Sequence, residues 1–133
     1  MAVITIFKNE QITVYYYPEE KIIHHVMHKY TYGQTFRDAL MAGAEAMKTY
    51  GAHKWLSDDR NNPVLSPEDQ KWGIEVWEPQ VIEAGWKYWA IVQPEHVIAK
   101  WRMLKLAEMY SKKGITVQLF TDPEEGMKWL ESQ

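Results

Sequence analysis

Carboxylates, amides, a guanidinium and a serine hydroxyl gather in the middle of this chain. Asp58-Asp59-Arg60-Asn61-Asn62 is followed, after three intervening residues, by Ser66. Such groups suit a hard cation, a phosphoryl group, or docking of an anion or peptide. Neighbouring residues of a strand point to opposite faces, so Asp58 and Asp59 are not expected to share one metal ion. We therefore expect a partner-binding surface without a metal, made of Asp58, Asp59, Arg60, Asn61, Asn62 and Ser66.

Ser66 has a second interpretation as a structural residue. It stands directly before Pro67 and three residues before Asp69, the pattern of a helix N-cap. Such a cap contributes about 1 kcal/mol, which is reason enough for a serine at this place. Phosphorylation is the alternative, because a phosphate is also favoured at a helix N-terminus.

Three histidines lie in one run that predicts a strand: His24, His25 and His28. His24 and His28 share a face but stand about 13 Å apart, while His25 points to the other face. A regular strand therefore excludes a shared metal, and half-exposed histidines are expected. The chain has no cysteine. It also shows no glycine-rich phosphate loop and no nucleophile–base pair, so we expect no catalytic residue and no cofactor.

Aromatic residues are unusually frequent, with seven tryptophans and eight tyrosines. An aromatic core is the favoured interpretation, and spare tryptophans on the surface would suit a homodimer. The alternative is an apolar-ligand pocket between helix and sheet, whose candidate lining is Trp72, Trp77 and Trp101.

The bulk composition bounds the class of protein. A chain of 133 residues with 46% hydrophobic and 25% charged residues predicts a single domain, 1–133, with a real core. A net charge of −3 leaves no basic field for nucleic acid. No apolar run approaches the roughly 20 residues of a membrane span, and residues 1–8 look like a strand, not a signal peptide. We expect a cytoplasmic protein.

Apolar residues recur along the chain at alternating spacings: every second residue, as in strands, and about every 3.6 residues, as in helices. Strands are predicted at 3–7, 11–17, 21–28, 54–57, 87–92 and 115–120, and helices at 33–50, 67–85, 94–114 and 122–130. Pro79 should kink or split the second helix, which we expect to turn Trp72 and Val76 inward. The order predicts a mixed α/β fold: an antiparallel meander leads into β-α repeats, and helices pack on the sheet.

In the order of its predicted strands and helices and in several short sequence segments, the chain resembles the STAS-like fold, in its SpoIIAA-like branch, which includes many bacterial proteins. The carrying segments are YGAHKWLSDDR at 50–60, LSPEDQ at 65–70, WEP at 77–79 and FTDPEEGMKWL at 120–130. The resemblance covers nearly all of the chain. It implies a non-catalytic module that binds proteins or, in some relatives, small apolar ligands.

In the anti-sigma antagonists of that group, a phosphorylated serine opens the helix after the middle strand. Ser66 takes a similar place, and Ser57 lies before it at the end of the predicted strand. Neither serine stands in the Asp-Ser-x-Gly motif of those switches. The expected function is a cytosolic interaction or regulatory module whose partner is another protein or a second copy of the chain. The alternatives are binding of a small apolar ligand or lipid, and hydrolysis by Asp58 or Asp59.

Overall fold

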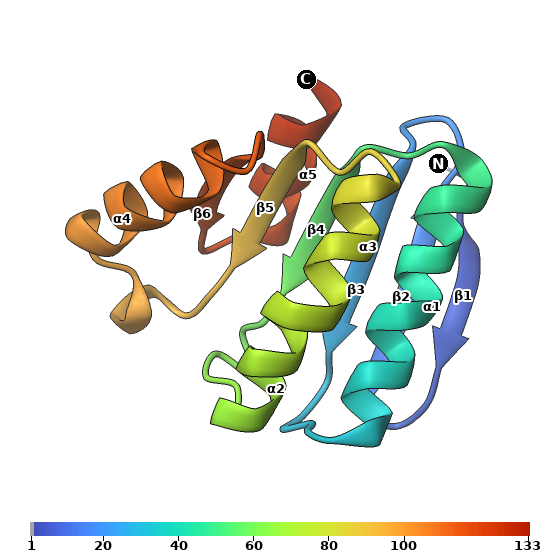
Figure 1. Cartoon of the computed structure of the whole chain (residues 1–133), viewed down its shortest axis with the longest axis horizontal. Helices are drawn as coiled ribbons and strands as arrows, with labels where there is room; N and C mark the ends of the chain where they lie inside the picture. Colours follow the sequence, from blue (N-terminus) through green and yellow to red (C-terminus); the bar gives the residue numbers. More distant parts are fainter. Residues whose placement is uncertain (1) are drawn as a thin grey trace.

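A computed structural model describes residues 2–133 and shows one six-stranded mixed sheet, whose strands lie side by side in chain order (Figure 1). The first two strand pairs are antiparallel, and the three later pairs are parallel. The predicted meander and parallel part are therefore confirmed. The strands are β1 Ile4–Lys8, β2 Ile12–Tyr17, β3 Ile22–Met27, β4 Lys54–Asp58, β5 Tyr88–Val92 and β6 Thr116–Phe120.

The helices form two layers. They are α1 Gln34–Tyr50, α2 Pro67–Trp72, α3 Glu78–Glu83, α4 Lys100–Ser111 and α5 Pro123–Glu131, with a π-helix, η1, at Gly73–Trp77 and a 3-10 turn, η2, at Glu95–Val97. The crossovers β3-α1-β4, β4-α3-β5 and β5-α4-β6 advance the same way across the sheet, so their helices share one face. Within the described residues 2–133, α5 is the one helix that covers the other face (Figure 1). Among residues 2–133, no helix combines the length and the apolar character that crossing a membrane requires.

Tryptophans build the larger core, between the sheet and the crossover helices. Trp55, Trp77, Trp86 and Trp89 form an edge-to-face series, with ring centroids 4.9, 5.2 and 5.1 Å apart. This geometry is favourable for aromatic pairs. Trp55 is fully buried, so the aromatic content does serve the core as predicted. A smaller core lies under α5 and contains Ile22, Leu56, Ala90, Val92 and Leu130.

The predicted break at Pro79 takes the form of the π-helix directly before it. The N–H of Glu78 donates to the carbonyl of Gly73, five residues earlier. Proline lacks an N–H and crowds the preceding turn, and one wider turn accommodates this without ending the helix. The wider turn also changes which side chains face the sheet: Trp77 is buried, but Val76 is 41% exposed. The prediction that Val76 faces inward is wrong.

The helix predicted from Pro94 begins later, at Lys100. The 3-10 turn η2 ends at an extended Ile98, and Ala99 is extended as well. The sequence pattern places Trp101 and Leu104 along one apolar face of the predicted helix, but with this later start they are 68% and 61% exposed. The side chains that pack against the larger core are instead those of Met103, Leu106, Ala107 and Tyr110.

Candidate functional site

A cavity of about 260 Å³ lies between the π-helix and α4, over the carboxyl ends of β3 and β4. Ile74 and Met109 are 55% and 42% exposed, so they mark its mouth. A second cavity, of about 280 Å³, adjoins the first, shares Asp59 and Trp89 with it, and extends to Arg102. The apolar walls of the first cavity are Phe36, Leu40, Leu65, Ile74, Trp77, Trp89, Met109 and Tyr110.

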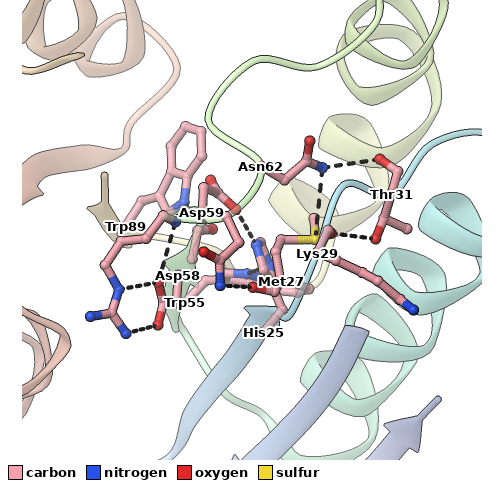
Figure 2. Close-up of polar contacts among 12 residues, drawn as sticks. His25, Met27, Lys29, Thr31, Trp55, Asp58, Asp59, Asn62 and Trp89 are labelled. Atoms are coloured by element: carbon pink, nitrogen blue, oxygen red, sulfur yellow. Dashed lines mark hydrogen bonds and ion pairs between the residues drawn. The ribbon is translucent and has the colours of Figure 1, made fainter. Parts of the chain in front are cut away.

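His25 and Asp59 form the polar floor of this cavity (Figure 2). Asp59 Oδ1 lies 2.7 Å from His25 Nε2, and Trp55 Nε1 lies 2.9 Å from His25 Nδ1. An indole N–H can only donate, so Nδ1 accepts and the ring proton lies on Nε2. Trp55 therefore fixes the neutral tautomer in which His25 donates to Asp59. The prediction that His25 is half-exposed is wrong, because the residue is only 4% exposed.

Ser57 completes a serine–histidine–aspartate group at the floor. Ser57 and His25 are direct partners in the β3–β4 register, and Asp59 bonds to His25. A nucleophilic serine needs a histidine nitrogen that accepts its proton. Both nitrogens of His25 are already bonded, one to Asp59 and one to Trp55. Ser57 Oγ instead accepts a hydrogen bond of 2.8 Å from Trp89 Nε1, which makes it a support of the cavity wall.

Two further carboxylates line the cavity, and each has a cationic partner. Asp69 Oδ1 accepts from Arg37 Nε at 3.1 Å, and its Oδ2 accepts from the backbone N–H of Gly33 at 2.9 Å. Glu78 accepts from Lys113 Nζ at 2.7 Å and from the hydroxyl of Tyr110 at 2.6 Å. Burial and this bond to Glu78 raise the pKa of Tyr110 above its ordinary value. The Glu78 bonds join α3 to the end of α4, which holds the two sides of the cavity together.

Asp58 points to the opposite face from Asp59, as strand alternation predicts. It is buried and accepts two bonds from Arg60, at 2.9 Å from Nε and 2.8 Å from the terminal nitrogen (Figure 2). This hydrogen bonding raises the pKa of Arg60. The Arg60 side chain is 46% exposed, so the pair holds a guanidinium at the surface.

The remaining predicted site residues secure loops. Asn61 Nδ2 donates to the carbonyl of Met27, and the buried Asn62 donates to the carbonyl of Thr31, so both tie the loop after β4 to the segment after β3 (Figure 2). Ser66 accepts from the N–H of Asp69 at 3.2 Å, which confirms the predicted N-cap. Of the six predicted partner-binding residues, only Asp59 lines the cavity.

The predicted ligand-lining tryptophans separate in space. Trp77 lines the cavity. Trp72 packs edge-to-face on Phe36 with Arg37 over its ring, and Trp101 lies exposed beside a shallow depression on α4. Neither Trp72 nor Trp101 lines the cavity. Trp77 lies in the π-helix, which turns it inward, whereas the late start of α4 leaves Trp101 pointing outward.

His24 lies on the α5 face, away from the cavity. Its Nδ1 lies 3.0 Å from the hydroxyl of Tyr17, and its Nε2 is buried without a partner among residues 2–133. Burial, followed by the neighbouring His25, lowers the pKa of His24 to about 4.

Sequence reasoning missed His25 and Glu78. His25 shares a strand face with Ile23 and Met27, an apolar pattern that signals burial. Glu78 carried no such signal, because its partners, Tyr110 and Lys113, lie more than thirty residues later, in α4 and directly after it. In the described residues 2–133, no three His, Cys, Asp or Glu side chains gather as a metal site would require. No protein-family model, curated protein or solved structure matches this chain.

Proposed function

We propose that this chain is a non-catalytic binding protein for a small, mainly apolar molecule, which it holds in the cavity between the π-helix and α4. One observation carries the proposal: an apolar cavity with a few polar groups at its floor opens at the carboxyl edge of parallel strands. This is the make-up and the place of small-molecule sites in α/β proteins. The π-helix in its wall supports the same conclusion, since π-turns are frequent at functional sites.

The size of the cavity limits the ligand. A buried apolar cavity of about 150 Å³ is enough to hold benzene. The present cavity, at about 260 Å³, suits a ligand with one ring and a short chain. We further propose that the fold is of the SpoIIAA-like, STAS-like kind, which the three leading strands and the following β-α repeats support.

Titration with 2-phenylethanol, a neutral one-ring probe, tests the binding proposal. Each tryptophan side chain gives an indole ¹H–¹⁵N NMR signal, so the ligand can be located. We expect the signals of Trp77 and Trp89 to shift together, because both line the cavity. The signals of Trp101, exposed on α4, and of Trp129, on the α5 face, should stay in place.

A matched pair of variants provides the control. Ile74→Glu places a charge at the mouth, whereas Val76→Glu places the same charge on the same helical turn outside the cavity lining. Both side chains are exposed, so both variants should fold. Weaker binding in the first variant only is the expected result. Equal effects in both, or shifts spread over all indole signals, would contradict the proposal.

A second proposal is that the chain is a protein-interaction module, which the surface around Arg60, on the opposite face of β4 from the cavity, supports. Arg60 is exposed but held in one orientation by the buried Asp58, and Asn61 is exposed next to it. A guanidinium that is already ordered loses little entropy on binding. We take a second copy of the chain as the partner. Sedimentation at increasing concentration should show self-association that Arg60→Gln weakens and the exposed control Lys48→Gln does not.

A further inference from the structure

We infer that the ligand of the cavity between the π-helix and α4 carries a protonated amine, which the carboxylate of Asp59 binds. The inference rests on the proposed binding function and specifies its ligand class. It depends on two properties of the lining: which carboxylate lacks a counter-ion, and which hydrogen-bond donors are free.

Asp59 is the cavity carboxylate without a cation. Asp69 and Glu78 have Arg37 and Lys113 within 3.1 and 2.7 Å. Asp59 has a hydrogen bond from His25, but Trp55 holds that ring in its neutral tautomer. Within residues 2–133, no other side chain donates to Asp59, whose side chain is still 20% exposed. A cation delivered by a ligand would therefore complete this group.

Like Arg37, the other two arginines, Arg60 and Arg102, have partners other than Asp59. Arg60 forms its bidentate pair with Asp58 on the opposite face of β4. Arg102, in the adjoining cavity, donates to the side-chain oxygen of Gln93. Neither makes an ion pair with Asp59 among the contacts of residues 2–133.

Most of the donors that line the cavity are already used. An anionic ligand, or one with acceptors only, would need free N–H or O–H groups in the wall. Six lining side chains carry donors: His25, Ser57, Gln70, Trp77, Trp89 and Tyr110. All but Ser57 donate to protein atoms, in this order the carboxylate of Asp59, the carbonyl of Leu65, the carbonyl of Leu40, Ser57 Oγ and the carboxylate of Glu78. The hydroxyl of Ser57 accepts from Trp89 and donates to no atom of residues 2–133. The cavity thus offers mainly acceptors, which favours a ligand that brings its own donor.

Aromatic faces favour the same charge. Trp77, Trp89 and Tyr110 line the cavity. The face of an aromatic ring is electron-rich, so it attracts a cation and repels an anion. Tyr110 already has Lys113 Nζ 4.7 Å from its ring centroid, which leaves Trp77 and Trp89 as the rings available to a ligand cation. A partly desolvated carboxylate strengthens the attraction, since charges interact more strongly away from bulk water. An ammonium on a one-ring ligand satisfies the cavity size, the carboxylate and the aromatic walls together.

Three probes that share a phenyl ring and differ in charge test the inference. They are 2-phenylethylamine as the cation, 2-phenylethanol as the neutral compound and 3-phenylpropanoate as the anion. We expect the wild-type chain to bind the amine about ten-fold more tightly than the alcohol, and the anion most weakly. Asp59→Asn keeps an oxygen that accepts from His25, so the fold should persist, but it removes the charge. In that variant the amine and the alcohol should bind equally.

Asp38→Asn is the matched control, because it removes the same charge from an exposed position on α1. It should retain the preference for the amine. Equal binding of amine and alcohol to the wild type would overturn the amine inference and leave the cavity proposal standing. A preference that survives Asp59→Asn would overturn the assignment to Asp59. Failure of all three probes to shift the Trp77 and Trp89 signals would overturn the proposed function itself.

Discussion

Gly43→Ala is expected to destabilise the protein, although alanine is the better helix former. Gly43 lies in α1 against the indole of Trp55, and a Cβ there would stand 2.3 Å from ring atom Cη2. Trp55 is fully buried and anchors His25, so its ring has nowhere to move without losing that bond. The substitution therefore acts on the cavity floor through Trp55 and its bond to His25.

The expected magnitude follows from three contributions. Overpacking costs about 1–3 kcal/mol. Loss of the buried bond from Trp55 to His25 costs about 1–3 kcal/mol, and the gain in helix propensity returns up to about 1 kcal/mol. Together these contributions give a net loss of about 1–6 kcal/mol in the free energy of unfolding, measured by urea denaturation with far-UV circular dichroism.

Gly73→Ala is the matched control for this prediction. Gly73 also has helical dihedral angles, and a Cβ there would meet nothing within 4 Å. Removing the conformational freedom of this glycine should stabilise the protein by about 0.5–1 kcal/mol. The packing argument is refuted if Gly43→Ala is as stable as the wild type and leaves the Trp55 indole signal unchanged.

Two further predictions concern buried ionisable groups. The pKa of His24 is lowered from 6.5 to about 4 in the folded chain, so the unfolded chain takes up its proton first as the pH falls. Stability should therefore decline between about pH 6.5 and pH 4, by about 3 kcal/mol in total, and urea denaturation across this range should show that His24→Gln lacks the decline. Lys113→Met leaves the buried Glu78 without its cation, and it should lower the unfolding free energy by about 1–3 kcal/mol. A smaller loss in a Glu78→Gln background would attribute the effect to the pair, whereas an equal loss would contradict it.

The order and type of most elements could be predicted because the signals are local. Ser66 accepts a bond from a residue three positions away, and Gly51 adopts the left-handed conformation that ends α1. The alternation of apolar residues in β2 and β3 likewise follows from the pleat of a strand. The start of α4 was harder to predict from the sequence. Apolar residues keep a helical spacing there, but Ile98 and Ala99 are extended and interrupt the helix.

The strands, the crossovers and the opposite directions of Asp58 and Asp59 follow from the amino-acid order, since they depend on neighbours along the chain. Which polar groups meet depends on how the elements pack together. His25 joins Asp59 and Trp55 from another strand, and Glu78 joins Tyr110 across two helices. Those contacts span about thirty or more residues, and hydrophobic periodicity says nothing about side-chain partners at that separation. The cavity and the carboxylate of Asp59, which has a hydrogen bond from His25 but no cation, are therefore products of packing.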